Sequence, residues 1–375
     1  MVAVDRNAEA PGLAEADVGE VVDFSDIEAV AEVGRHERVE GVMTMASDRA
    51  VVIVAALAEA LGLPGIGSRA AHAMTHKVTM RRLFAERGVP QPAFGGVRTL
   101  VEARSVLQTV GVPAVLKPAD SAGQRGIFLI RSADELEAHL HASLAASSAE
   151  EAILETFHEG LEVNTLLVVR NGSATLVTAS DRLRPSDGGF GVALAHLYPS
   201  TVFGDVLAEI EQAAIASVHA LGLRNGIAYP QLLVTDAGVL VVEVAARIPG
   251  GQMGEVARLG VGVDLLEIAV LQALGREVPD ELVTPRFQQP LAIRFLTARP
   301  GPLPTGRIQS VGTLEKARAF PGVERVETWI EPGETIRPVQ VDGDRRGYVI
   351  AFGDTNLEAL ERAEAAAGLI DVLTE

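Results

Sequence analysis

The chain has 375 residues, of which 48% are hydrophobic and 22% charged, and its formal net charge is −18 at pH 7. This length predicts two or three packed lobes, and the composition suits a large core and excludes a disordered chain. The acidic balance and the lack of a Lys/Arg cluster argue against a nucleic-acid partner. No cysteine is present, which excludes disulfides and thiolate metal sites. No apolar run reaches the ~18–20 residues of a membrane span, and no signal peptide is visible. We therefore expect a cytoplasmic chain without a membrane partner.

Lysine is rare in this sequence. Of 32 basic residues only three are lysines, namely Lys77, Lys117 and Lys316. Because arginine supplies almost every other positive charge, a retained lysine is a candidate for a task that needs a compact, flexible ammonium group. Chance is the alternative explanation.

Residues 1–70 read as a βαβ lobe. Short apolar runs predict strands over 2–5, 21–24 and 41–44, with helices over 27–33 and 50–61 between them. This alternation is typical of a parallel sheet. Such sheets usually begin with a strand and a glycine-rich turn that this sequence does not show. We therefore expect the first βα unit to be missing, or to lie upstream of the start used here.

The remaining chain divides at a proline-rich segment near 285–304, which predicts a central region over 71–285 and a small α+β lobe over 286–375. Helices are expected over 75–87, 100–110, 205–221, 264–274 and 357–367. Strands are expected over 114–118, 126–131, 150–157, 162–169, 174–179, 227–234, 239–244, 323–329 and 348–352.

A small-residue loop follows the strand that carries Lys117. It reads Lys117-Pro-Ala-Asp-Ser121-Ala-Gly123-Gln-Arg-Gly126. Small residues let backbone amides approach phosphate oxygens, and the lysine adds charge. The loop is neither a Walker A loop nor a dinucleotide fingerprint. An ordinary hairpin loop is the alternative.

A second motif, Glu155-Thr156-Phe157-His-Glu-Gly-Leu-Glu162, joins two expected strands. Carboxylates there can accept hydrogen bonds from ribose hydroxyls, while adjacent backbone groups can pair with an adenine edge. Alone, the motif also fits a solvated acidic turn.

A third motif runs from Glu243 through Arg247 and Gly250-Gly251 to Met253. Glu243 alternates with apolar residues at the end of a buried strand, where an unpaired carboxylate is costly and Mg²⁺ is a natural partner. Arg247 can grip a phosphate or acyl phosphate, and the glycine amides can stabilise developing negative charge. The alternative is a buried Glu–Arg ion pair.

In this order and spacing, the three motifs resemble the ATP-grasp superfamily of carboxylate–amine and carboxylate–thiol ligases. The segment Thr75-His-Lys77-x-x-Met-Arg81, followed by Gly88-Val-Pro-Gln-Pro92, is similar to the family's first ATP-binding lysine and the exit that follows it. Lys117-Pro118 is similar to the second. The run from Glu243 to Met253 and the end segment 347–351 look more like the L-amino-acid ligase branch than biotin carboxylases, which have asparagine at the position of Ala245.

The resemblance implies an α/β chain with an ATP-grasp fold, a truncated biotin-carboxylase-like N-terminal lobe with a parallel sheet, and a small C-terminal α+β lobe. It implies ATP and Mg²⁺ (or Mn²⁺) as cofactors, and carboxylate and amine substrates such as amino acids. The carboxylate would attack the γ-phosphate, giving an acyl phosphate and ADP, and the amine would then form an amide and release phosphate.

The residue roles follow from the same resemblance. Lys77, Lys117 and the loop with Ser121, Gly123 and Gly126 would bind the ATP phosphates. Glu155, Thr156, Phe157 and Glu162 would hold the nucleoside, Glu243 and Gln231 the metal, and Arg247, Gly250 and Gly251 the transferring group. His196, Arg182, Arg184 and Met253 are weaker candidates for substrate contacts.

One departure concerns the metal site, because Gln231 stands where the superfamily usually has a second glutamate, and an amide should weaken Mg²⁺ binding. Two rival readings stay open, namely a regulatory ATP-binding protein without catalysis, and a carboxylase-type enzyme acting on bicarbonate. A homodimer is a further expectation.

Overall fold

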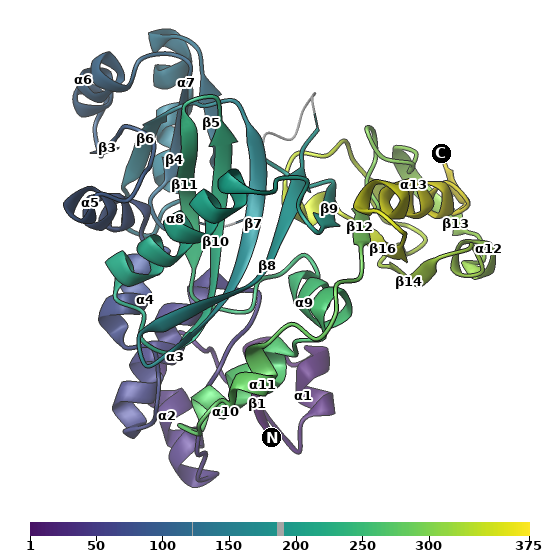
Figure 1. The fold of residues 1–375 in the computed structure, drawn as a ribbon, viewed down its shortest axis with the longest axis horizontal. Helices are drawn as coiled ribbons and strands as arrows, with labels where there is room; N and C mark the ends of the chain where they lie inside the picture. The colour runs from purple at the N-terminus through teal and green to yellow at the C-terminus, as the bar shows by residue number, and fades with distance from the viewer. Residues whose placement is uncertain (122, 186–190) are drawn as a thin grey trace.

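The computed structural model describes residues 1–121, 123–185 and 191–375. At the N-terminus, strands β1 (Val2–Asp5) and β2 (Val18–Val21) pair in parallel around α1 (Pro11–Glu15). Helices α2 (Ile27–His36), α3 (Asp48–Leu61) and α4 (Ser68–Thr75) complete this lobe, drawn in purple in Figure 1. The expected parallel pairing is confirmed, and α4 runs across the expected boundary at residue 70.

Two of the expected N-terminal strands are wrong. The second strand covers 18–21 rather than 21–24, and residues 41–44 form no strand. A Cβ on Gly41 would lie 2.6 Å from the carbonyl oxygen of Ala273, so the segment packs against the end of a distant helix instead of joining β2. Beyond it, Met45 makes an isolated parallel bridge with Ile248.

The second lobe is an antiparallel sheet with the strand order β3-β6-β4-β5. Its strands are β3 (Phe94–Val97), β4 (Ala114–Pro118), β5 (Phe128–Ile130) and β6 (Ala152–Thr156). Helices α6 (Leu100–Val110) and α7 (Ala133–Ala145) share a hydrophobic core with these strands. Helix α5 (Lys77–Arg87) leads into the lobe, and Figure 1 shows it beside β3.

An eight-stranded antiparallel sheet with the order β11-β10-β7-β8-β9-β12-β16-β14 forms the centre of the molecule. Its strands are β7 (Leu161–Arg170), β8 (Ser173–Leu183), β9 (Ala195–Tyr198), β10 (Gly226–Thr235), β11 (Gly238–Ala245), β12 (Leu291–Phe295), β14 (Val323–Thr328) and β16 (Gly347–Phe352). Helix α8 (Asp205–Leu221) packs on one face, sharing a core with α4 and α5. Helices α9 (Met253–Val261) and α10 (Leu265–Ala273) pack on the other.

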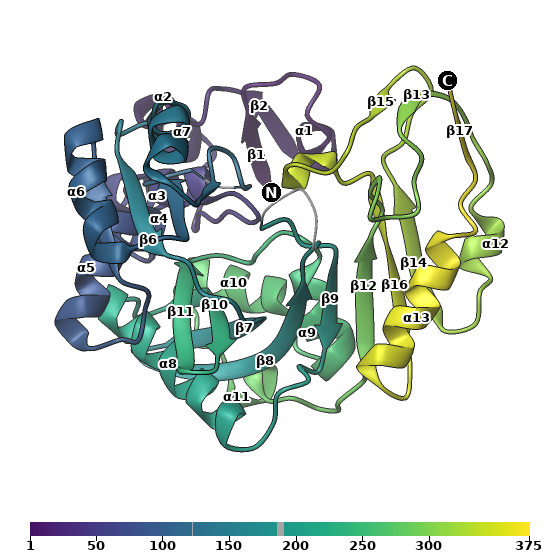
Figure 2. The same cartoon turned by 90° about the horizontal axis from the view of Figure 1, so that it is seen from above.

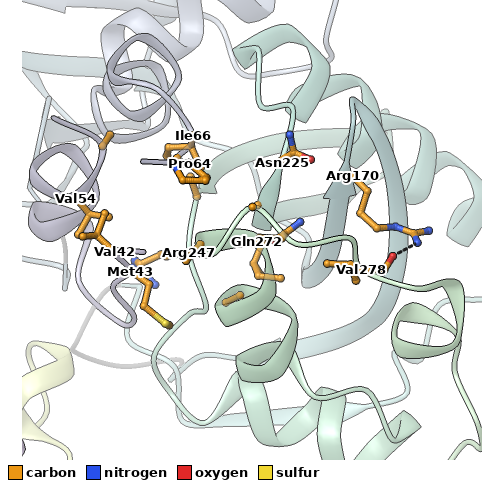
Figure 3. Close-up of a pocket in the computed structure, with 18 of the residues that line it drawn as sticks. Val42, Met43, Val54, Pro64, Ile66, Arg170, Asn225, Arg247, Gln272 and Val278 are labelled. Carbon is orange, nitrogen blue, oxygen red and sulfur yellow. Dashed lines mark hydrogen bonds between the residues drawn. The ribbon is translucent and has the colours of Figure 1, made fainter. Parts of the chain in front are cut away.

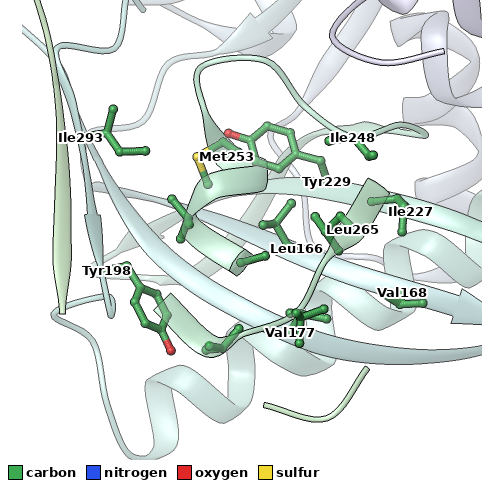
Figure 4. Packing of buried hydrophobic residues seen from close by; sticks show 14 of the residues in the cluster. Leu166, Val168, Val177, Tyr198, Ile227, Tyr229, Ile248, Met253, Leu265 and Ile293 are labelled. Atoms are coloured by element: carbon green, nitrogen blue, oxygen red, sulfur yellow. The ribbon is translucent and has the colours of Figure 1, made fainter. Parts of the chain in front are cut away.

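The core beneath α9 and α10 covers only part of that second face. Figure 4 shows Leu166, Tyr229 and Met253 packed together there, with Leu265 and Ile227 beside them. Next to this core, Asn164, Gln231 and Glu243 form a polar row across β7, β10 and β11. Polar residues at one end of an otherwise apolar face mark the part of the sheet that is available for a site.

The C-terminal region continues the same sheet. Because β12, β14 and β16 extend it, the expected boundary at residue 286 is not a break between sheets. A separate small sheet, β15-β13-β17, lies beside it together with α12 and α13, as Figure 2 shows. The remaining elements are α11 (Asp280–Val283), β13 (Gly306–Val311), α12 (Glu315–Arg318), β15 (Thr335–Ile336), a 3₁₀ turn (Asp342–Asp344), α13 (Asn356–Ala367) and β17 (Val372–Thr374). Within the described residues, no helix is both long and apolar enough to cross a membrane.

Candidate active site

A narrow cleft of about 100 Å³ lies between the four-stranded sheet and the polar end of the large sheet. It opens into a wider cavity of about 830 Å³, with which it shares Phe157, Glu162, Arg182 and several other residues. The cleft brings together nine of the residues singled out in the sequence, namely Lys117, Glu155, Thr156, Phe157, Glu162, Arg182, Arg184, Gln231 and Glu243.

Lys117 is held by a buried charged cluster at the base of this cleft. Its Nζ lies 2.6 Å from Glu155 Oε2, and Arg81 Nε lies 2.7 Å from Glu155 Oε1. Burial alone would raise the pKa of Glu155, but the charges of Arg81 and Lys117 outweigh it and hold this pKa at about 2. Both carboxylate oxygens are therefore engaged within the protein. Glu155 thus contacts Arg81 and Lys117, and the ribose contact expected of it stays a prediction.

Lys77 occupies a second buried position and links the small-residue loop after β4 to the large sheet. Its Nζ donates to the carbonyl oxygen of Ser121 at 2.8 Å and lies 3.0 Å from Glu243 Oε1. Burial by itself would raise the pKa of Glu243, but the charges of Lys77 and Lys117 lower it. Two of the three lysines thus act on the same carboxylate, and Glu243 is ionised and available to a cation.

The loop after β4 is described except for Ala122. Gly123 and Gly126 both have positive φ, 72° and 71°. A Cβ on Gly126 would lie 2.8 Å from the Ala146 Cβ and 2.9 Å from the Pro118 Cγ, whereas one on Gly123 would meet nothing within 4 Å. Gly126 is therefore needed for close packing at the loop's end, while Gly123 leaves room above the backbone for a phosphate group.

The remaining expected nucleoside contacts have protein partners of their own. Thr156 Oγ1 donates to the carbonyl oxygen of Val110 at 2.9 Å. Glu162 forms ion pairs with Arg182 and Arg184, the latter at 3.1 Å. The two arginines expected to recognise a substrate carboxylate are therefore bound to a carboxylate of the protein itself.

Gln231 and Glu243 are direct register partners on β10 and β11, and Asn164 on β7 is the next partner in the same row. Among the described residues no cluster of three or more His, Cys, Asp or Glu side chains could hold a metal. Mg²⁺ is commonly bound by one or two carboxylates together with substrate phosphates. The Glu243 carboxylate and the Gln231 amide oxygen fit an ion held in that shared manner.

Arg247 lies outside the narrow cleft, beside a cavity of about 820 Å³ between the N-terminal lobe and the large sheet. Its Nε donates to Asp48 Oδ1 at 2.7 Å. Figure 3 shows Arg247 at this cavity with Val42, Met43 and Ile66 of the N-terminal lobe. Gly250 and Gly251 follow Arg247 and lead into the N-terminus of α9, where the helix dipole favours negative charge.

Met253 and His196, the other two candidates for substrate contacts, lie in different surroundings. Met253 is fully buried in the core beneath the sheet and packs near Tyr229, as Figure 4 shows, and the substrate contact expected of it stays a prediction. Its apolar side chain anchors the first turn of α9. His196 is also buried, but it lies beside Gly251, because a Cβ on that glycine would be 3.3 Å from His196 Nε2.

Sequence reasoning missed Arg81, Asp48 and Asn164 as members of the site. Arg81 has a local signal, because residues four apart lie on the same helix face and Arg81 follows Lys77 at that spacing. Asp48 and Asn164 have none, since their partners are 199 and 32 residues away.

The comparisons with known proteins concern the ATP-grasp domain and the fold. Residues 75–250 match the family model for the phosphoribosylglycinamide synthetase ATP-grasp (A) domain. The structure resembles the L-amino acid ligase from Bacillus licheniformis with a TM-score of 0.82 at 20% identity, over 96% of this chain and 88% of that one. Residues 75–250 thus match an ATP-grasp domain, and the chain has the fold of ATP-grasp proteins, one of which was solved with MgADP.

Residues 294–375 match the model for L-amino acid ligase C-terminal domain 2. A formate-dependent phosphoribosylglycinamide formyltransferase from Ignicoccus hospitalis is 28% identical over the whole chain and 90% of its own length. The biotin carboxylase domain of a Hydrogenobacter thermophilus 2-oxoglutarate carboxylase, solved with MgADP, has a TM-score of 0.77 at 18% identity, over 99% of this chain and 85% of that one.

Proposed function

We propose that this protein is an ATP-dependent carboxylate–amine ligase that forms an amide or peptide bond through an acyl phosphate and releases ADP and phosphate. The observation that carries this proposal is that Lys117 and Glu243 line one cleft between two sheets, with Lys77 Nζ 3.0 Å from Glu243 Oε1. Two ammonium groups and one carboxylate there suit a triphosphate and its cation.

Separate groups of residues would bind the phosphates, hold the metal and stabilise the transferred group. Lys77 and Lys117 neutralise phosphate oxygens, and the loop with Ser121 and Gly123 covers them. Glu243, with the amide oxygen of Gln231, would hold Mg²⁺, which supplies charge neutralisation of the phosphates when bound. Arg247 and the amides of the Gly250–Gly251 loop stabilise negative charge as the phosphoryl group is transferred and the amine attacks. No side-chain nucleophile is required, since the substrate carboxylate attacks directly.

The cavity beside Arg247 supplies space for the substrate skeleton. Its N-terminal wall is apolar and includes Val42, Val54 and Ile66, which favours a substrate with an apolar side chain over a charged one. Val54→Phe would narrow this wall and should raise KM for bulky substrates while leaving KM for ATP unchanged.

The reaction is tested by measuring ADP release across pairs of carboxylates and amines, using substrates labelled with ¹⁸O in the carboxylate. The proposal predicts ADP release that depends on both partners, and transfer of one labelled oxygen to inorganic phosphate. ATP binding without substrate-dependent ADP release would instead favour a regulatory protein. ADP release that depends on bicarbonate alone would favour a carboxylase.

Relatives support the class of reaction. Those named formate-dependent phosphoribosylglycinamide formyltransferase are named for a reaction that starts from a small carboxylate. The match of residues 294–375 to an L-amino acid ligase domain favours amino acids as the substrates to test first.

A further inference from the structure

Three polar side chains form a chain of hydrogen bonds across the cleft-facing end of the large sheet. Gln231 Nε2 lies 3.4 Å from Asn164 Oδ1, and Asn164 Nδ2 lies 3.1 Å from His196 Nδ1. Asn164 and His196 are 1% and 3% exposed. The three residues come from β10, β7 and β9, so the chain of bonds joins the expected metal ligand to a buried histidine beside Gly251.

Asn164 and His196 meet above a strand that lies between theirs. Strand β8 separates β7 from β9, and strands two places apart are about 9–10 Å apart. The residue of β8 in register with Asn164 is Ser180, which is fully buried and whose Oγ has no hydrogen-bond partner. Its small side chain leaves the space through which the two longer side chains reach each other.

The donors and acceptors of these amides fix the direction of every bond. Gln231 Nε2 can only donate, and the acceptors within its reach are Asn164 Oδ1 at 3.4 Å and the Tyr229 hydroxyl at 3.5 Å. Asn164 Nδ2 therefore faces His196, where it too can only donate. The His196 Nδ1 atom must accept this bond, and a neutral imidazole with an accepting Nδ1 carries its proton on Nε2.

The surroundings keep His196 neutral and aim its Nε2. Burial, together with the charges of Arg182 and Arg345, holds the pKa of His196 well below its usual value. The ring meets Phe295 edge-on, with 5.5 Å between ring centroids. A Cβ on Gly251 would lie 3.3 Å from His196 Nε2 and 3.5 Å from Phe295 Cζ, so Nε2 lies beside Gly251.

We propose that Gln231 and Asn164 are positioning residues that hold His196 as the Nε2–H tautomer, a neutral hydrogen-bond donor to a substrate oxygen at the Gly250–Gly251 loop. Only the identity of that oxygen rests on the proposed function. The tautomer itself follows from the protein's own hydrogen bonds.

A carboxylate at position 231 would reverse the chain of bonds, because it has no N–H to donate. In Gln231→Glu the Asn164 amide would turn its Nδ2 toward the new carboxylate and its Oδ1 toward His196. The imidazole proton would then move to Nδ1, and Nε2 would become an acceptor. Replacing the amide nitrogen of Gln231 by an oxygen would thus remove the Nε2–H donor of His196, although His196 lies two side chains away.

The tautomer can be measured by NMR on the full-length protein labelled with ¹⁵N-histidine, because protonated and unprotonated ring nitrogens resonate in separate regions. His196→Gln assigns the signal by its loss. We expect Nε2–H in the wild type and in Gln108→Glu, an exposed control on α6 with the same change of charge. We expect Nδ1–H in Gln231→Glu and in Asn164→Asp. An Nδ1–H wild type, or an Nε2–H signal retained in both site variants, would overturn the proposal.

Turnover gives a second, independent readout. If the ligase proposal holds, Asn164→Asp, which leaves the expected metal ligands in place, should lower kcat for amide formation by about 10- to 100-fold, the scale of a misplaced catalytic contact, with KM for ATP within twofold of wild type. A wild type that shows the Nε2–H tautomer but no substrate-dependent ADP release would refute the ligase and leave the positioning of His196 standing. Unchanged kcat in variants whose tautomer has moved would refute the role of the donor.

Discussion

Arg81 and Glu155 are 74 residues apart in the sequence, yet Arg81 Nε lies 2.7 Å from Glu155 Oε1, and neither side chain is more than 3% exposed. The same guanidinium donates at 2.7 Å to the carbonyl oxygens of Val241 and Val242, just before Glu243. One side chain thus joins α5, β6 and β11, which are the elements that carry Lys77, Glu155 and Glu243.

Removing this guanidinium should destabilise the whole protein. Arg81→Met leaves Glu155 buried with Lys117 as its remaining ionic partner and leaves the two carbonyls without their donor. Breaking a buried ion pair costs about 3–5 kcal/mol of unfolding free energy. The matched control is Arg104→Met, because Arg104 pairs with Glu137 at 2.7 Å on the surface, where such a pair contributes about 0–1 kcal/mol. Equal losses in urea denaturation would contradict this reading.

Lys117 should be essential for nucleotide binding. Lys117→Ala removes the ammonium that faces phosphate, and we expect most of the ATP affinity to be lost in calorimetry. Lys117→Arg should also bind poorly, because the planar guanidinium does not replace a compact ammonium between Glu155 and a phosphate. Lys316→Ala, on the exposed helix α12, is the control. ATP affinity of Lys117→Ala equal to that of Lys316→Ala would remove Lys117 from the nucleotide site.

Arg247 should act on turnover rather than on ATP binding. Arg247→Ala is expected to lower kcat by ~10²–10³, the scale of losing one donor to transition-state charge, with little change in ATP affinity. Arg337→Ala, at an exposed position, should leave both unchanged. A Kd for ATP that rises in parallel with the loss of kcat would instead place Arg247 on the nucleotide.

Gln231→Glu also tests the metal assignment. A carboxylate attracts a divalent ion far more strongly than an amide oxygen in a partly dry site, so this variant should need less Mg²⁺ for half-maximal ATP binding. The measurement is a Mg²⁺ titration at fixed ATP, with Gln108→Glu as control. An unchanged Mg²⁺ requirement would mean that Glu243 and the phosphates alone hold the ion.

The stability of the protein should decrease below pH 6.5 because of His196. Its pKa is lowered in the folded state from an ordinary value of 6.5, so the unfolded chain binds the proton more readily. The contribution of neutral His196 to the free energy of unfolding is therefore fully present above pH 6.5. It is lost as the pH falls toward the lower folded pKa, and the loss is about 1.4 kcal/mol at pH 5.5. His196→Gln should lack this component when unfolding free energies at pH 8 and pH 5.5 are compared. An equal pH dependence in both proteins would show that His196 titrates normally.

The elements that the sequence predicts best are those with their own end signals. The helix at 100–110 begins after Thr99, whose capping box with Glu102 is present, and the helix at 205–221 ends at Gly222 with φ 79°. Helix α7 went unpredicted although Ser132 accepts from the backbone of Glu135, a signal of the same kind. The segment at 41–44 carried a strand pattern, but contact with α10 decided its path.

The residues of the candidate site likewise fall into those with a local sequence signal and those without one. The small-residue loop, the acidic motif and the Glu243–Arg247 pair could be recognised because each is local in sequence. Their partners could not, since Asp48 meets Arg247 across 199 residues and Arg81 meets Glu155 across 74. Sequence spacing predicts which residue types lie at the site, whereas tertiary packing decides which charge neutralises which.

The scarcity of lysine makes this protein unusually simple to label. Lys77 and Lys117 are 9% and 12% exposed as side chains and are paired with carboxylates, whereas Lys316 lies exposed on α12 in the C-terminal region. Amine-reactive dyes and surface-coupling reagents should therefore attach through Lys316 in preference to the other two lysines, with the exposed α-amino group of Met1 as a second reactive amine. A molecule immobilised through Lys316 would be held by α12, with the cleft around Lys117 left open to ligands in the surrounding solution.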